Sequence, residues 1–278
     1  MEQVAEDCFA QILSFASPQE ACSLCVVSRM VQSMADSDTV WEKFLPLDYG
    51  EIVSRIVAPS MPCSSKKDLF VTLCTPQLID HGNKTFWIEK RTGKICYQLS
   101  ARELSIAWGN CPLYWSWKPV QGSRFKEAAE LRTICWLEMN GSISTGMLSP
   151  KTLYSAYLKV KIADRAYGLD SLPSQVLVEV GHYKSHGSVY IRPSHSHSRR
   201  NGESAASSGP EKEEWLEIEL GSFYTGLDKE VVKMGLKEVK GVHLKGGLIV
   251  DGIEIRPKKV EAESTNGPPF VYRRPIKA

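Results

Sequence analysis

The chain has 278 residues, 42% hydrophobic and 24% charged, which is ordinary for a globular protein and enough for one large domain or an ordinary domain plus a small one. Lys and Arg number 34 against 32 Asp and Glu, and the net charge of +2 argues against binding to nucleic acid or to a membrane surface, since both need clustered cations. The N-terminus is acidic, no signal-peptide h-region follows, and no apolar stretch approaches the ~18 residues of a membrane span. We therefore expect a cytoplasmic or nuclear protein whose eight cysteines are reduced.

Residues 1–46 are predicted to form a unit of short amphipathic helices. Apolar side chains recur at helical spacing from Cys8 to Leu13. The run Ser17-Pro18-Gln19-Glu20 predicts the start of a second helix, continuing to Ser28, with a serine N-cap, a proline in the first turn and a glutamate that completes a capping box. Asp36 or Ser37 is expected to cap a third helix, which contains Val40, Trp41 and Phe44. Such short helices bury little surface alone, so we expect this unit to need a partner.

Residues 47–83 are predicted to be a helical connector. The stretch from Leu47 to Val57 is weakly helical, a breaker-rich loop follows, and a further helix capped by Ser64 or Ser65 is expected to extend to Cys74. The connector therefore separates the N-terminal helices from the rest of the chain.

From residue 84 the apolar period changes from 3.6 to 2, which indicates strands. Residues 86–99 predict a hairpin whose turn is Arg91-Thr92-Gly93. Alternation typical of half-buried strands recurs in the runs Tyr154–Ile162, Val176–Val180, Leu216–Leu220 and Ile253–Ile255. We expect an α+β multidomain chain in which residues 84–257 form an antiparallel β-sandwich.

Two polar stretches lack any apolar period. Residues 181–210 are rich in Ser, His, Gly and Arg and are expected to form a long exposed loop within the sandwich. Residues 258–278 carry several prolines and cations, and we expect them to be a disordered tail.

An aromatic cluster is the most unusual feature of the sequence. Three of the seven tryptophans fall between residues 108 and 117, where a glycine and a proline interrupt the run as they would not in a continuous core strand. Indole rings are flat and apolar, so they suit the C–H face of a sugar ring. Trp108 and Trp115 stand beside turn residues and are candidate sugar platforms. The alternative is that the cluster fills a core, which is the role we expect for Trp117.

Catalytic and metal-binding patterns find little support. Cys22-x-x-Cys25 has the spacing of half a zinc site, but no second half follows, and the histidines of residues 181–210 are expected to be solvated. No Gly-x-Ser-x-Gly elbow or phosphate-binding glycine loop occurs. Glu217 and Glu219 are expected to lie on a solvated strand face rather than across a glycosidase cleft. We therefore expect no catalytic residues, no metal and no cofactor.

Two resemblances cover residues 3–257. The N-terminal block, from Glu6 to Phe15 with Ser17-Pro18, Val27-Ser28 and Trp41-Glu42-Lys43-Phe44, resembles an F-box. Five ordered motifs resemble the phloem protein 2 family, which includes the tobacco-type (Nictaba-type) plant lectins and a plant subfamily fused to F-boxes. These motifs are Ser100–Gly109, Tyr114–Trp117, Ser123–Phe125, Leu148–Thr152 and Gly252–Pro257.

The resemblances imply partners for both parts of the chain. An F-box packs against a Skp-type adaptor, which links it to a cullin scaffold; the adaptor-binding residues assigned here are Ile12, Leu13, Pro18, Leu24 and Val27. The lectin family implies a jelly-roll sandwich that binds N-acetylglucosamine oligomers and N-glycan cores, and its sugar-contacting tryptophans match Trp108 and Trp115. One departure is that Val4-Ala5 stands where F-boxes usually have Leu-Pro, which weakens the expected adaptor interface.

The function expected from these observations is that of a non-catalytic substrate receptor of a Skp–cullin–F-box ubiquitin ligase. Its target would be a carbohydrate or glycoprotein, with no nucleic acid or membrane partner. The alternative is a stand-alone cytoplasmic lectin or structural phloem-type protein with a vestigial F-box, and glycoside hydrolysis is a third hypothesis.

Overall fold

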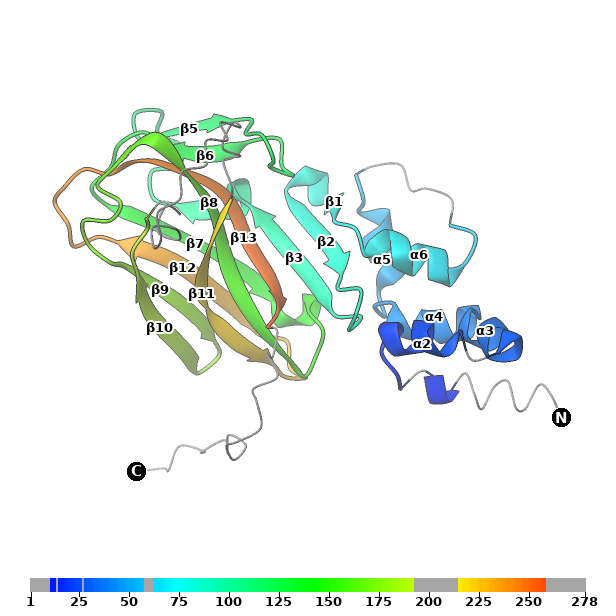
Figure 1. The fold of residues 1–278 in the computed structure, drawn as a ribbon. Coiled ribbons are helices and arrows are strands. Elements are labelled where there is room, and N and C mark those ends of the chain that lie inside the picture. The colour runs from blue at the N-terminus through cyan, green and yellow to red at the C-terminus, as the bar shows by residue number, and fades with distance from the viewer. Residues whose placement is uncertain (1–10, 14, 27, 58–62, 193–214, 259–278) are drawn as a thin grey trace, which may run out of the picture.

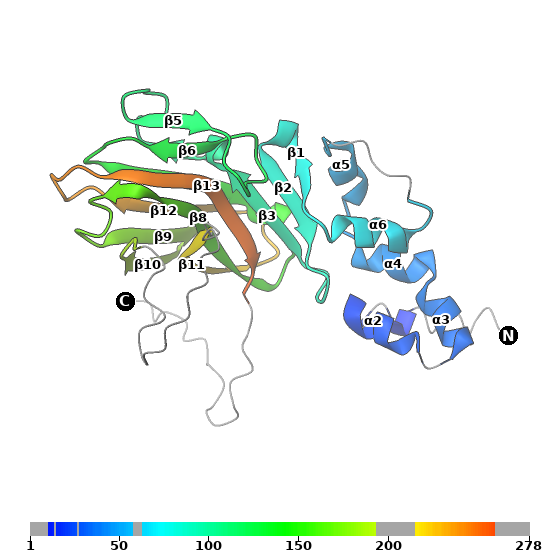
Figure 2. The same cartoon turned by 45° about the horizontal axis from the view of Figure 1, so that its top comes forward.

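The computed structural model describes residues 11–13, 15–26, 28–57, 63–192 and 215–258. Short helices precede a sandwich of two antiparallel sheets, and the helices lie to one side of the sandwich, next to β1 and β2 (Figure 1 and Figure 2). In this part of the chain no helix has both the length and the apolar character that a bilayer span requires. The α+β organisation expected from the sequence is confirmed.

The helices begin at the caps that the sequence provides. In α2 (Pro18–Leu24) the Ser17 hydroxyl accepts the Glu20 N–H at 3.2 Å and the Glu20 carboxylate accepts the Ser17 N–H at 2.7 Å, so the capping box is confirmed. The expectation that this helix reaches Ser28 is wrong. The Ser28 side chain instead accepts the Val31 N–H and caps a new helix, α3 (Arg29–Ala35).

Among the described residues three α-helices follow α3, and an aromatic core joins the first and the third of them. These are α4 (Asp38–Phe44), α5 (Tyr49–Ser54) and α6 (Lys66–Leu73), with Ser37 at the N-cap of α4 and Ser65 capping α6 as expected. The rings of Trp41 and Phe70 lie 5.2 Å apart, both residues are buried, and the Trp41 indole N–H donates to the Ala35 carbonyl at 2.8 Å. The indole thus joins three helices, because Ala35 belongs to α3.

The sandwich comprises an eight-stranded sheet A and a five-stranded sheet B over the described residues. Sheet A follows the order β1-β2-β3-β13-β6-β5, and β8 joins β13 to β11. Its strands are β1 (Gln77–Ile79), β2 (Lys84–Ile88), β3 (Ile95–Ser100), β5 (Trp115–Lys118), β6 (Ala128–Leu131), β8 (Thr152–Tyr167), β11 (Leu216–Thr225) and β13 (Gly246–Pro257). Sheet B has the order β10-β9-β12-β7-β4. Its strands are β4 (Ser105–Ile106), β7 (Leu137–Ser144), β9 (Ser174–Val180), β10 (Tyr183–Val189) and β12 (Val231–Glu238).

The predicted hairpin and four alternating runs are strands of this sandwich. Gly93 in the β2–β3 turn has a φ of 70°, a conformation that favours glycine. Sheet A begins earlier than expected, because β1 lies within the range assigned to the connector and pairs with β2.

Part of the expected loop is a strand. Residues 183–189 form β10, which pairs with β9 at all seven positions, so the expectation of a loop over 181–210 is wrong there. As an edge strand with little side-chain burial, β10 has no apolar alternation to reveal it. Residues 193–210 lie outside the described residues, as do Val4-Ala5 and residues 259–278 of the expected tail.

Candidate functional site

Trp108 lies in the loop between β4 and β5, two residues after the end of β4. Its side chain is 53% exposed and its backbone has a φ of 52°, which is uncommon for a bulky residue. Backbone hydrogen bonds from Gly109 N–H to the Ile106 carbonyl (2.9 Å) and from Cys111 N–H to the Trp108 carbonyl (2.8 Å) hold the tight turns on either side. The Tyr114 ring lies 6.0 Å away between centroids. The loop therefore presents one indole to solvent from a backbone that is fixed by hydrogen bonds.

Trp115 differs from the sequence expectation. It is the first residue of β5 and only 2% exposed, so the expectation that it offers an open ring face is wrong, because its side chain packs into the core. Its indole N–H donates to the Ala107 carbonyl at 3.0 Å. Trp115 thus supports the residue that precedes Trp108.

Trp117 supports the other side of the same loop. It is half-buried at the edge of the core, and its indole N–H donates to the Gly109 carbonyl at 2.9 Å. The Arg102 guanidinium lies 3.5 Å from its ring centroid and pairs with Glu127 at 2.6 Å. The residues on both sides of Trp108 therefore each accept a hydrogen bond from a tryptophan of β5. Sugar contact by Trp108 or Trp115 stays a prediction.

Trp136 was not singled out from the sequence, where it stands alone. Its side chain is 43% exposed and its indole N–H donates to a carboxylate oxygen of Glu138 at 2.8 Å. The Glu138 carbonyl accepts the Ala107 N–H at 2.9 Å, so Trp136 is two residues from the point where β7 meets the Trp108 loop. Only strand pairing brings this tryptophan near the cluster.

The expected adaptor-binding residues divide into two groups. Ile12 (66% exposed) and Leu24 (38%) are accessible, whereas Leu13 (1%) and Pro18 are buried. The expectation that Leu13 and Pro18 are partly exposed is therefore wrong in the free chain. Pro18 packs toward the β2–β3 turn, where a Cβ added to Gly93 would lie 3.2 Å from its Cγ. The remaining residue, Val27, lies outside the described residues.

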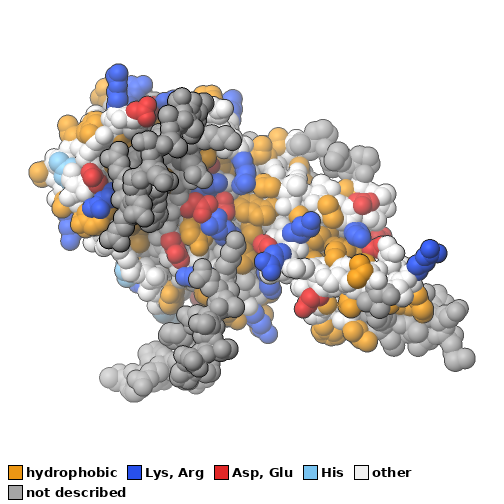
Figure 3. Space-filling model, viewed as in Figure 1, with side chains coloured by type: hydrophobic (Ala, Val, Ile, Leu, Met, Phe, Trp, Pro, Cys, Tyr) orange, Lys and Arg blue, Asp and Glu red, His pale blue; other side chains and the backbone are white. Residues whose placement is uncertain are grey.

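Other apolar side chains near Ile12 and Leu24 in sequence are strongly exposed. Phe15 is 86% exposed, Val26 88% and Met30 58%. Figure 3 shows hydrophobic side chains gathered over α2, at the end of the molecule that the helices form. Sequence reasoning missed these three because they fit no helical face.

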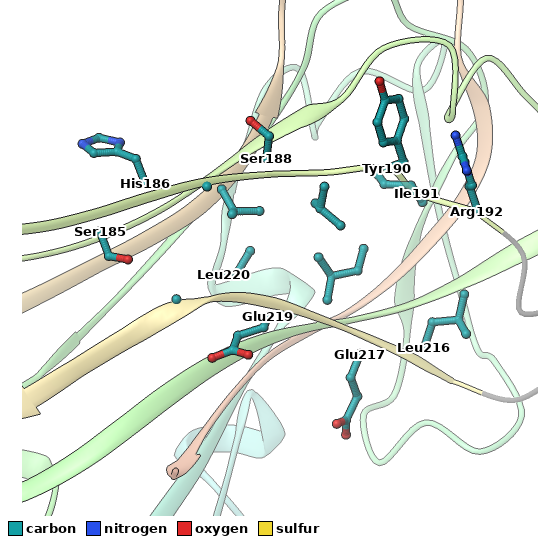
Figure 4. Close-up of a pocket in the computed structure, with 15 residues that line it drawn as sticks. Ser185, His186, Ser188, Tyr190, Ile191, Arg192, Leu216, Glu217, Glu219 and Leu220 are labelled. Carbon is teal, nitrogen blue, oxygen red and sulfur yellow. The ribbon is translucent and has the colours of Figure 1, made fainter. Parts of the chain in front are cut away.

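The carboxylates of β11 are exposed on a solvated strand face, as expected, and both are ion-paired. Arg256 pairs with Glu217 through both terminal nitrogens, at 3.0 and 2.6 Å, and Lys258 lies 3.2 Å from Glu219. Burial acts to raise the pKa of Glu219, but the Lys258 ammonium together with hydrogen bonds from Ser222 and Ser155 outweighs it, and the pKa is lowered. A groove of about 540 Å³ separates β10 from β11, and Figure 4 shows both carboxylates pointing away from it. Among the described residues no three His, Cys, Asp or Glu side chains form a metal-binding group.

Comparison with known proteins identifies the family. Residues 94–257 match the model of the Phloem protein 2 family. The chain is 44% identical to F-box protein PP2-B15 of Arabidopsis thaliana, covering 93% of this chain and 98% of that protein, and 41% identical to F-box protein VBF of the same plant, covering 93% and 100%. A family 35 carbohydrate binding module from Clostridium thermocellum has a TM-score of 0.32 at 11% identity over 59% of this chain and 98% of the module, which is too low to support an argument. The chain belongs to the phloem protein 2 family, as one of its F-box proteins.

Proposed function

We propose that the chain is the non-catalytic substrate-recognition subunit of a Skp–cullin–F-box ubiquitin ligase. The N-terminal helices dock onto the Skp-type adaptor and the sandwich binds a glycan or glycoprotein target. The observation that carries the proposal is the exposed apolar surface of five side chains in the N-terminal segment: Ile12, Phe15, Leu24, Val26 and Met30. A chain that operated alone would leave this surface in water, whereas an adaptor would cover it.

The target-binding half of the proposal rests on Trp108. An exposed indole that is held by its own backbone loses little conformational freedom when it stacks on a ligand. N-acetylglucosamine oligomers and N-glycan cores are the ligands proposed for it.

Adaptor docking is tested by a double substitution, Ile12→Ala with Leu24→Ala. Burying a leucine-sized side chain is worth ~1.5–3 kcal/mol, so capture of a purified Skp-type adaptor should fall at least tenfold. Both side chains are exposed in the free chain, and the thermal midpoint should stay the same.

The matched control removes an equally apolar and exposed side chain elsewhere. Leu227→Ala changes a residue of the sandwich that is 75% exposed, and adaptor capture should be unchanged. If the double variant binds the adaptor as tightly as the unaltered chain, the proposed interface is wrong. If the unaltered chain captures no adaptor, the stand-alone lectin becomes the better hypothesis.

A further inference from the structure

We propose that the outer face of sheet B carries an oligosaccharide-binding groove that continues from the Trp108 loop. The sandwich would then bind a chain of several sugar residues rather than one terminal sugar. This inference rests on the glycan-binding half of the proposed function and adds a second set of binding residues to it.

The groove has a volume of about 530 Å³ and crosses β7, β12, β9 and β10. It lies on the solvent side of the sheet, since the polar side chains that line it alternate along their strands with the buried residues Met139, Val176 and Leu236. Its polar lining consists of Glu138, Asn140, Gln175, His186, Ser188 and Lys237. These residues come from four strands, so strand pairing alone brings them together.

The floor of the groove is formed where side chains are small or apolar. Gly235 pairs with Asn140 on one side and with Leu177 on the other, and Leu177 is half-buried. A Cβ at position 235 would lie 2.2 Å from the Asn140 amide oxygen, so the amide lies across the glycine. An exposed amide beside glycine backbone and a leucine matches a sugar ring, which has hydroxyls at its edge and C–H groups on its face.

The charges in the groove favour a neutral ligand. Lys237 and Glu138 are cross-strand partners on the same face and offset each other, and the next strand adds the neutral Gln175 beside Lys237. A polyanion would need clustered cations, and an apolar peptide would need deep apolar pockets. Amide, ammonium, carboxylate and hydroxyl groups together can donate to and accept from sugar hydroxyls.

Glu138 connects the groove to the Trp108 loop. Its side chain lines the groove and accepts the Trp136 indole N–H, while its carbonyl accepts the Ala107 N–H next to Trp108. Four strands are separated by three spacings, which at ~4.8 Å each give a length of roughly 14 Å across the sheet. That length exceeds a single sugar ring and fits a short oligosaccharide.

The test compares ligand lengths by isothermal titration calorimetry on the full chain. N-acetylglucosamine and its tetramer are the probes, and the tetramer should bind at least tenfold more tightly. The double variant Gln175→Ala with Lys237→Ala should lose about tenfold in tetramer affinity and leave the monomer affinity unchanged. The control, Ser142→Ala with Lys233→Ala, alters exposed residues of the same face outside the groove lining. It should change neither the tetramer affinity nor the monomer affinity.

The possible outcomes separate the inference from the proposed function. If Trp108→Ala weakens binding but the groove variant and the ligand length do not matter, the groove is wrong and the Trp108 site stands. If the groove variant weakens tetramer binding and Trp108→Ala does not, the groove stands as an independent site. If neither sugar binds the unaltered chain, both the groove and the Trp108 site are wrong. The adaptor-docking half of the proposed function is tested separately, by adaptor capture.

Discussion

At the scale of single residues, the hydrogen bonds on either side of Trp108 explain why three tryptophans are clustered. Trp115 and Trp117 each donate an indole N–H to a carbonyl that neighbours Trp108, and both are packed at least partly against the core. Of the three rings, only that of Trp108 is largely exposed. The cluster is one exposed ring with two supports.

This division of roles predicts opposite effects of two substitutions. Trp108→Ala should lower the affinity for N-acetylglucosamine oligomers about tenfold or more, since one stacked indole is worth ~1–2 kcal/mol, and should leave the thermal midpoint unchanged. Trp115→Ala should lower the free energy of unfolding by ~3–5 kcal/mol, because it empties a core position. Calorimetric titration and chemical denaturation measure the two effects. Equal loss of stability in both variants would contradict the assignment.

The sequence identifies the aromatic cluster but not the orientation of its rings. Composition and the glycine and proline breaks mark residues 108–117 as unusual. The burial of Trp115 depends on which face of β5 is turned toward the core, and the burial of Pro18 depends on a β-turn about 75 residues away, from 93 − 18 = 75. Neither contact leaves a local pattern. Trp136 was missed for the same reason.

At the scale of elements, one ion pair joins the helices to sheet A. The guanidinium of Arg55, which follows α5, makes two 2.8 Å hydrogen bonds to Asp80, which follows β1. The hydrogen bonds from Arg55 lower the pKa of Asp80 to about 2, and Lys84 adds to this against the opposing effect of burial. Because the pKa is lower in the folded chain than its ordinary value of 3.8, the pair stabilises the fold above pH 4.

This pair predicts a specific acid response. Its contribution to the free energy of unfolding should be lost as the pH falls from about 4 to 2. Asp80→Asn should lower the free energy of unfolding at pH 7 by on the order of 1–2 kcal/mol, and this variant should depend less on pH between 4 and 2 than the unaltered chain. Asn tolerates the φ of 52° at this position, so the backbone should not be strained. Urea unfolding at a series of pH values measures both effects. If the free energy of unfolding of Asp80→Asn falls between pH 4 and 2 as steeply as that of the unaltered chain, other carboxylates cause the loss of stability in acid.

The edge strand β10 gives a further prediction at this scale. Deleting residues 185–209 removes most of β10 and exposes the edge of β9, so the thermal midpoint should fall by several degrees. The sequence alone predicts no change, since this stretch lacks an apolar period. A control deletion of residues 193–209 leaves β10 intact. Equal midpoints for the two deletions would mean that β10 adds nothing to stability.

At the scale of the whole molecule, the order of elements was predictable and the contacts between the two parts were not. Caps and alternation locate helices and strands because both are local signals. Contacts across the helix–sandwich boundary join distant positions, such as the 3.0 Å hydrogen bond from Arg91 to Gln19 and the bridge between Ile56 and Ile79. Pairing of this kind has no sequence signature in a single chain.

The central place of β13 in sheet A has a consequence for synthesis on the ribosome. β13 pairs with β3, β6 and β8, yet among the strands of the described residues it is the last to be made. β3 ends at Ser100 and β13 begins at Gly246, so 245 − 100 = 145 residues must be added first, which takes roughly 7–30 s at 5–20 residues per second. During that interval the helices are already complete. The nascent chain therefore has its N-terminal helices in hand before the strand that completes the middle of sheet A exists.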